Sequence, residues 1–252
     1  MTTLVQELED AVIDAWPPAE YEELDGWGLR ASGGPTRRGN SVATLGAKDK
    51  LELADRIAQA EAFYQARKQP AIFQVGPCAT PKGLDAALAE RGYRVDGEAL
   101  AAVAVPDEVL SRLARTHETS VATRASDVWL DHAGKSGRFS EHFKVFADTL
   151  SRLGTRCRFA TVRDARGTVT GTCLGIASED RLGVYNMLTS PAVRRKGIGK
   201  ALLRALAESA MAERMRELYL LVELENQVAR ALYAQAGFAE LYRYHYRVRD
   251  FP

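Results

Sequence analysis

The fold of this chain is decided by the stretch YNMLTSPAVRRKGIGKA, residues 185–201. The residues ahead of Ser190 are mostly apolar, which favours a strand that ends near Thr189. After the stretch, leucines and alanines recur at helical spacing, so a helix with one buried face is expected to begin beside Gly199. The loop between these elements holds consecutive cations and two glycines. Unpaired backbone N–H groups and the positive end of the helix dipole meet there, which predicts a site for phosphate or pyrophosphate.

The spacing of this loop excludes two familiar phosphate-binding motifs. A P-loop needs Gly-x-x-x-x-Gly-Lys-Ser/Thr, whereas Gly199 and Lys200 are followed by Ala201. A dinucleotide fingerprint needs a third small residue where Leu202 stands. What remains is Arg-x-x-Gly-x-Gly, beginning at Arg194. Taken alone, this motif is also compatible with a tight turn on a basic surface.

A second pattern lies downstream of the first. Leu218–Val222 is expected to form a short strand, and residues 226–238 a helix closed by Gly237. The order Arg-x-x-Gly-x-Gly, helix, strand, Asn-x-x-Ala-x-x-Leu-Tyr-x-x-x-Gly-Phe resembles the core of the GNAT superfamily of acetyl-CoA-dependent N-acetyltransferases. The resemblance is clearest from about residue 155 to 248 and extends back to about residue 118. It implies an acyltransferase with a mixed α/β (α+β) sheet.

The first half of the chain repeats the element order of the second. When Gly92 is set on Gly237, 145 residues later, strand, helix, strand, helix, Gly-aromatic pair and strand coincide along both halves. This predicts two tandem copies of the GNAT fold, a degenerate domain over residues 1–106 and a catalytic domain over residues 118–252.

The N-terminal copy lacks the residues of the anion site. The loop after Leu45 has no Arg-x-x-Gly-x-Gly, and Leu88 stands where the second copy has Tyr233. We therefore expect one cofactor site per chain. The N-terminal copy then serves as a scaffold or helps to shape the acceptor site.

The resemblance implies a set of coenzyme contacts in the second copy. The N–H groups from Arg195 to Lys200 would hold the pyrophosphate of coenzyme A, while the Arg and Lys side chains add screened attraction. Strand residues would pair with the pantetheine amides, and one Asn would contact the coenzyme from the second helix. The implied cofactor-binding residues are Met187, Leu188, Thr189, Arg194, Arg195, Lys196, Gly197, Ile198, Gly199, Lys200, Asn226 and Tyr233.

Two residues are candidates for proton transfer. Tyr233 is predicted to be the general acid for the departing thiolate; the alternative is a core tyrosine with a satisfied hydroxyl. A substrate ammonium, with a pKa of about 10, must also lose a proton. The strand before the loop offers no carboxylate on the facing positions, so Glu223, at the end of the next strand, is the candidate base, directly or through water. A solvated strand-end charge is the alternative for Glu223. Cys173 lies in an apolar strand, which favours direct transfer in a ternary complex over a covalent intermediate.

Composition limits the partners. The chain has 252 residues, of which 46% are hydrophobic, and 34 Lys and Arg against 33 Asp and Glu give a net charge of +1. This balance gives no electrostatic case for nucleic acid or an anionic membrane. Three cysteines without metal-type spacing predict reduced thiols in a cytosol and no metal site. An acidic N-terminal segment and the lack of a long apolar run argue against a signal peptide or membrane span.

The acceptor is the least determined part of the prediction. We expect a primary amine of a small molecule or peptide, acetylated from acetyl-CoA as cosubstrate, in a protein that is a possible homodimer. His132 and His142 fall in the helical region that forms the acceptor wall in such folds, so a substrate contact and an ordinary exposed histidine both remain open. A catalytically weak protein that binds or senses acyl-CoA is the alternative function.

Overall fold

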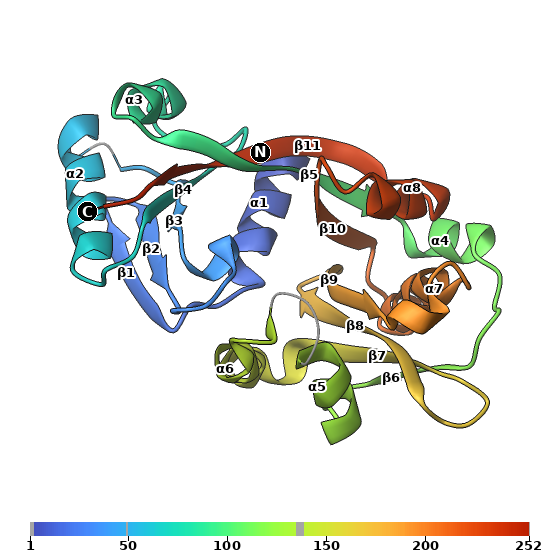
Figure 1. Ribbon diagram of the computed structural model, residues 1–252. Helices are drawn as coiled ribbons and strands as arrows, with labels where there is room; N and C mark the ends of the chain where they lie inside the picture. The colour runs from blue at the N-terminus through green and yellow to red at the C-terminus, as the bar shows by residue number, and fades with distance from the viewer. Residues whose placement is uncertain (1–2, 49, 135–138, 252) are drawn as a thin grey trace. The chain divides into compact units, whose positions relative to one another are not determined.

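The chain divides into two compact units in the computed structural model. Unit 1 comprises Met1–Leu100 and Tyr242–Pro252, and unit 2 comprises Ala101–Leu241. Two long strands, β5 (Arg94–Ala104) and β11 (Ala239–Arg249), each begin in one unit and end in the other (Figure 1). The residues that the structure describes are 3–48, 50–134 and 139–251.

Unit 2 combines helices with a mixed sheet (Figure 1). Its elements are α4 (Pro106–Arg112), β6 (Thr119–Ala122), α5 (Asp127–Gly134), α6 (Phe143–Leu153), η3 (Gly154–Arg156), β7 (Cys157–Arg163), β8 (Val169–Ser178), β9 (Arg181–Thr189), η4 (Pro191–Val193), α7 (Ile198–Ala212), β10 (Glu217–Glu223) and α8 (Gln227–Gln235). The strands follow the order β10-β9-β8-β7-β6. Neighbours from β6 to β9 are antiparallel, whereas β9 and β10 are parallel. The helix expected after the glycine loop is α7, and it begins where the sequence predicts.

Glycines on β8 allow α7 to lie close to the sheet. A methyl group on Gly171 would come within 2.3 Å of Ile198 Cγ2, and one on Gly175 within 2.9 Å of a Leu206 methyl carbon. The apolar face of α7 is fully buried at Leu202 and Leu206. Burying each leucine contributes roughly 1.5–3 kcal/mol, so this contact fixes the start of α7 relative to the ends of β8 and β9.

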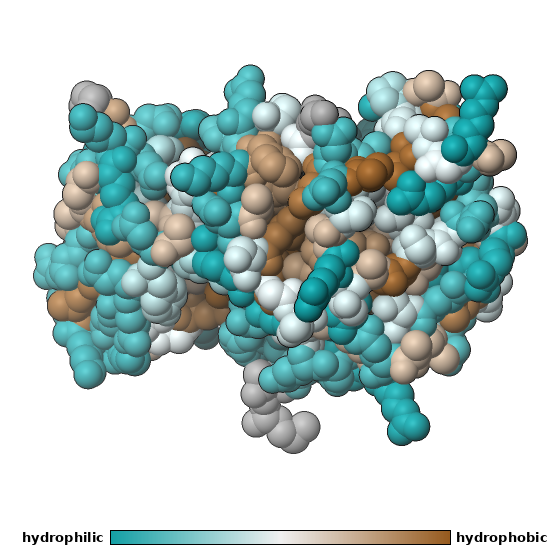
Figure 2. Space-filling view, turned by 90° about the horizontal axis from the view of Figure 1, so that it is seen from below, coloured by the Kyte–Doolittle hydropathy of each residue, from teal (hydrophilic) through white to brown (hydrophobic). Residues whose placement is uncertain are grey.

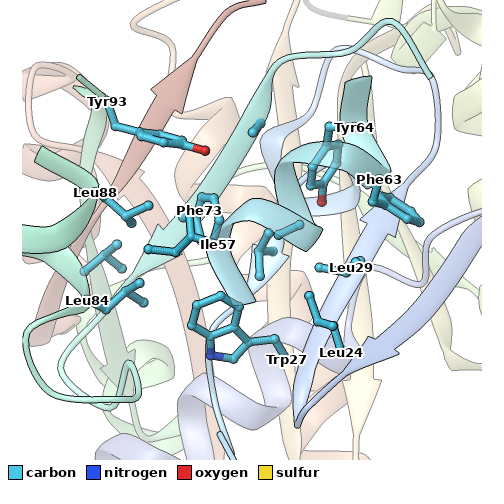
Figure 3. Close-up of a cluster of buried hydrophobic side chains, with 14 of the residues drawn as sticks. Leu24, Trp27, Leu29, Ile57, Phe63, Tyr64, Phe73, Leu84, Leu88 and Tyr93 are labelled. Carbon is cyan, nitrogen blue, oxygen red and sulfur yellow. The ribbon is translucent and has the colours of Figure 1, made fainter. Parts of the chain in front are cut away.

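Unit 1 has the strand order β1-β2-β3-β4-β11. Its core is a cluster in which the rings of Trp27, Phe73 and Tyr93 meet edge to face, with centroids 5.6 and 5.4 Å apart (Figure 3). The pairing of β11 with β4 gives this long strand a neighbour inside the chain. Its elements before β5 are α1 (Leu4–Asp14), β1 (Glu20–Leu24), β2 (Trp27–Ala31), η1 (Arg37–Gly39), β3 (Val42–Ala43), α2 (Leu53–Gln65), β4 (Ala71–Val75) and α3 (Leu84–Glu90).

Two elements were not predicted from the sequence. β1 is mostly exposed and rich in glutamate, so it lacks the alternation that marks a half-buried strand. α4 lies almost entirely between the two predicted domains, where no element was expected. Pro106 stands at its first turn with Asp107 and Glu108, which are helix-start signals.

The visible surface is mostly hydrophilic, with hydrophobic residues gathered in the right half of the view in Figure 2. Among the described residues, no helix is both long enough and apolar enough to cross a membrane.

Candidate active site

The parallel strands β9 and β10 separate halfway along their length. Their pairing runs from Arg181 opposite Glu217 to Val184 opposite Leu220. β9 nevertheless continues to Thr189, and β10 continues to Glu223. From Met187 to Thr189, β9 therefore keeps β8 on one side, and no residue of β10 pairs with its other edge over the part of the sheet that the structure describes. An unpaired edge presents N–H and C=O groups that an extended ligand can bond as a neighbouring strand would.

A β-bulge lies where the strands separate. Thr172 of β8 faces Leu188, whereas Leu174 faces Tyr185, so β9 carries one residue more than β8 over this interval. Asn186, inside the bulge, has a φ of 43°. Asparagine tolerates this left-handed region better than most residues. β9 is buried up to Tyr185 and half-buried afterwards, so the bulge marks the boundary between core strand and accessible edge.

The loop from β9 to α7 presents a run of unbonded backbone donors. The first hydrogen bond of the helix runs from Ala201 N–H to Gly197 O, at 3.0 Å. Within the described chain, no acceptor bonds the N–H groups from Arg195 to Lys200. Gly197 has a φ of 83°, and Arg195 has a φ of 65°. These values allow the turn that directs successive N–H groups toward one place, the geometry that suits an anion.

The predicted cations surround this run of donors. The side chains of Arg194, Arg195, Lys196 and Lys200 are all exposed. A residue that the sequence did not indicate lies next to the glycine of this loop: a methyl group on Gly197 would be 3.5 Å from His117 Cε1. His117 precedes β6 and carries no local motif, so only the fold brings it to this loop.

Tyr233 has the protonation state that a general acid requires. Its side chain is half-buried and its ring packs edge to face on Phe238, at 5.9 Å between centroids. Burial raises the pKa of Tyr233 above its ordinary value, and Cys173 raises it further. Among the residues described, none forms a hydrogen bond with the Tyr233 hydroxyl. The group thus holds a proton at neutral pH and has it available for a ligand.

The other two predicted residues, Asn226 and Glu223, lie at the start of α8 and at the end of β10. Asn226 is the N-cap of α8, and its Oδ1 accepts a hydrogen bond from Ala229 N–H at 3.1 Å. Its amide nitrogen is the group left to contact a coenzyme. Glu223 is exposed at the end of β10, on the far side of the opening between β9 and β10.

Two buried tyrosines, Tyr185 of β9 and Tyr219 of β10, lie where the pairing of these strands ends. Tyr185 donates a hydrogen bond to Tyr219 Oη at 3.1 Å, and Gly183 makes room for both rings, because a methyl group there would lie 2.4 Å from Tyr185 Cε2. Cys173 is fully buried, with its Sγ 3.3 Å from Tyr185 O, and burial raises the pKa of its thiol. These properties agree with the predicted packing role of Cys173.

His132 joins helix α5 to the strands. Its Nδ1 is 2.9 Å from Thr172 Oγ1, and its Nε2 is 3.0 Å from Ser190 Oγ. Burial lowers the pKa of His132, which favours the neutral ring. The structure therefore uses this histidine to fasten α5 beside the end of β9.

Known proteins resemble the chain over nearly its whole length. The uncharacterized N-acetyltransferase YobR of Bacillus subtilis (strain 168) is 31% identical over 253 residues, covering 97% of this chain and 98% of that protein. A GCN5-related N-acetyltransferase from Kribbella flavida has a TM-score of 0.70 at 13% identity, covering 100% of this chain and 98% of that one. A tandem GNAT protein from the clavulanic acid biosynthesis pathway has a TM-score of 0.70 at 15% identity, covering 99% and 90%.

Fold, homology and the opening in the sheet together define an N-acetyltransferase of the GNAT class, which confirms the predicted fold and acyltransferase activity. The chain belongs to the family described as "Probable histone acetyltransferase Rv0428c C-terminal", whose sequence model matches residues 2–247.

Proposed function

We propose that the chain transfers the acetyl group of acetyl-CoA to a primary amine of a small molecule or peptide, in the cytoplasm, by direct transfer within a ternary complex. The observation that carries this proposal is the continuity of two features in unit 2. The free edge of β9 leads directly into the unbonded N–H groups of the loop before α7.

The residues present fit coenzyme A. The N–H groups from Arg195 to Lys200 suit its diphosphate, and neither Gly197 nor Gly199 has a side chain to obstruct it. A methyl group on Gly199 would lie 2.9 Å from Leu232 Cδ2 and 3.5 Å from Met187 Sδ, so the glycine lets the loop approach both residues. The free edge from Met187 to Thr189 suits the pantetheine amides.

The reaction requires two proton transfers, and the chain offers a candidate residue for each. When bound, acetyl-CoA would supply the acetyl group as an activated thioester. Tyr233 would donate its proton to the sulfur as the carbon–sulfur bond breaks. A backbone N–H at the bulge beside Asn186 would stabilise negative charge on the acetyl oxygen. Glu223 would accept the proton that the amine releases, directly or through water.

Two measurements test the proposal. Calorimetry with coenzyme A should give one site per chain, and substitution of Gly197 should weaken binding. A mass-spectrometric screen of amino acids, polyamines, aminoglycosides and peptide N-termini with acetyl-CoA should give a product 42 Da heavier, about the mass of an added acetyl group. Tight coenzyme binding without any acetylated product would favour the alternative, a weakly catalytic acyl-CoA sensor. Absence of coenzyme binding would refute both functions.

A further inference from the structure

The N-terminal unit contains a counterpart of the loop that precedes α7. The 145-residue offset that aligns the two halves sets Leu53, the first residue of α2, on Ile198, the first residue of α7. The same offset sets Lys50 and Leu51 on Arg195 and Lys196. The N-terminal end of α2 is thus the place in unit 1 that corresponds to the run of unbonded donors in unit 2.

In unit 1 the first two of these donors are already bonded. The N–H of Lys50 lies 3.1 Å from Asp25 Oδ2, and the N–H of Leu51 also lies 3.1 Å from it. The guanidinium of Arg56, from the first turns of α2, pairs with the same carboxylate. One carboxylate therefore receives two backbone donors at a helix N-terminus together with a cation, an arrangement suited to binding an anion.

The carboxylate is placed there by a hairpin turn. Asp25 and Gly26 connect β1 to β2, with φ values of 47° and 91°. An Asp-Gly pair with positive φ at both positions is typical of a tight two-residue turn. The turn is held against the loop because Lys48 N–H donates to Asp25 O at 3.0 Å.

Asp25 and Arg56 are isolated from solvent. The side chain of Asp25 is 3% exposed and that of Arg56 is 1% exposed. Burial alone would raise the pKa of Asp25, but the N–H of Leu51 and the Arg56 guanidinium outweigh it and hold that pKa below its ordinary value. The Arg56 guanidinium also lies 5.0 Å from the centre of the Trp27 ring. A buried charged pair with these bonds is costly to separate.

The strand opening of unit 2 is also closed in unit 1. Parallel pairing of β3 with β4 continues through Ala43, the last residue of β3. Just beyond it, Thr44 Oγ1 donates to Gln74 O at 2.6 Å. The edge that an extended ligand would need is therefore bonded within the unit.

We propose that the Asp25 carboxylate is an internal anion that fills, in unit 1, the place that the coenzyme diphosphate fills in unit 2. The N-terminal copy is a self-occupied anion site that binds no coenzyme. The comparison with the diphosphate rests on the function proposed for unit 2, whereas the occupation by Asp25 rests on the contacts within unit 1 alone.

Amide hydrogen exchange by NMR tests this in the unaltered chain. The amides of Lys50 and Leu51 should be protected without any ligand and should not change when coenzyme A is added. Those from Arg195 to Lys200 should exchange fast alone and slow down with the coenzyme. Fast exchange at Lys50 and Leu51 that coenzyme A slows would overturn the proposal. If coenzyme A failed to slow exchange from Arg195 to Lys200 while Lys50 and Leu51 stayed protected, the result would instead count against the function proposed for unit 2.

A matched pair of variants tests it by binding. Asp25→Gly keeps a residue that accepts positive φ and removes the anion, whereas Asp25→Asn keeps the bulk without the charge. In calorimetry with inorganic pyrophosphate, Asp25→Gly should bind one more molecule per chain than the unaltered protein, and Asp25→Asn should bind no more than it. A folded Asp25→Gly protein without the additional site would refute the proposal. The exchange measurement needs no variant, so it decides the matter even where Asp25→Gly folds poorly.

Discussion

Replacement of Tyr233 by phenylalanine is expected to lower kcat without lowering the free energy of unfolding. In the described structure the hydroxyl receives and donates no hydrogen bond, so its removal breaks no contact. Leaving a buried polar group unpaired costs about 1–3 kcal/mol, and Tyr233 is only half-buried. We therefore expect the free energy of unfolding of Tyr233→Phe to be unchanged or slightly higher.

The catalytic effect of the same change should be large. A positioned general acid contributes roughly 10²–10⁴-fold, and each tenfold corresponds to about 1.36 kcal/mol of barrier. The loss of the phenolic proton should therefore lower kcat by about 100-fold or more, which is about 3 kcal/mol. Coenzyme binding should be nearly unaffected, because the ring stays in place against Phe238.

The assay is release of free thiol from acetyl-CoA in the presence of an acceptor found by the screen, with calorimetry for coenzyme affinity. Tyr219→Phe is the matched control, because Tyr219 is a buried tyrosine on the adjoining strand β10. It accepts a hydrogen bond from Tyr185, so its loss should lower stability by about 1 kcal/mol but leave kcat within a few-fold. A Tyr233→Phe protein that keeps more than a third of its kcat would refute the acid role.

Three further predictions follow from other parts of the structure. Gly197→Ala should lower the free energy of unfolding by about 1–2 kcal/mol, because alanine is strained at a φ of 83°. Gly197→Asn should lower the free energy of unfolding by less. Equal melting temperatures for the unaltered protein and the two variants would contradict this prediction. Glu223→Gln should lower kcat at least tenfold, by about 1.4 kcal/mol, whereas an unchanged kcat would leave Glu223 as a solvated charge. The partners Arg247 and His245 lower the pKa of Asp85 to about 2. Because the folded pKa lies below the unfolded one, this stabilisation is complete above pH ~4 and is lost as the pH falls toward about 2. Denaturant unfolding of Asp85→Asn should therefore show a deficit at pH 7 that shrinks over that window, and a deficit independent of pH would be contrary to the ion pairing.

Elements with strong periodicity or clear boundary signals were predictable from the sequence. The strand predicted over Leu218–Val222 lies within β10, and α7 begins beside Gly199 as expected. These elements satisfy local rules, since their apolar patterns and boundary residues agree with their final burial. β1 failed because an exposed edge strand has no buried face to produce a pattern.

The candidate site was only partly predictable for a similar reason. The donors from Arg195 to Lys200 follow from a local glycine motif. The bulge at Asn186 does not, because it depends on the register of β9 against β8, which is a property of two strands. His117 was missed because it reaches its loop from a segment that carries no motif of its own. Asp25 was missed because an Asp-Gly pair predicts a turn but does not predict which loop the turn will contact.

The two halves illustrate how one element order gives an open site in one copy and a filled site in the other. Both copies start a helix after a parallel strand, and that geometry always leaves backbone donors without partners. Such donors must be bonded by water, by a ligand or by the chain itself. Unit 2 leaves them to a ligand and separates β9 from β10 beside them. Unit 1 supplies Asp25 from a turn and keeps β3 paired with β4. A single turn residue and a few strand pairs would therefore be sufficient to account for the single coenzyme site that we propose per chain, without any loss of the fold in unit 1.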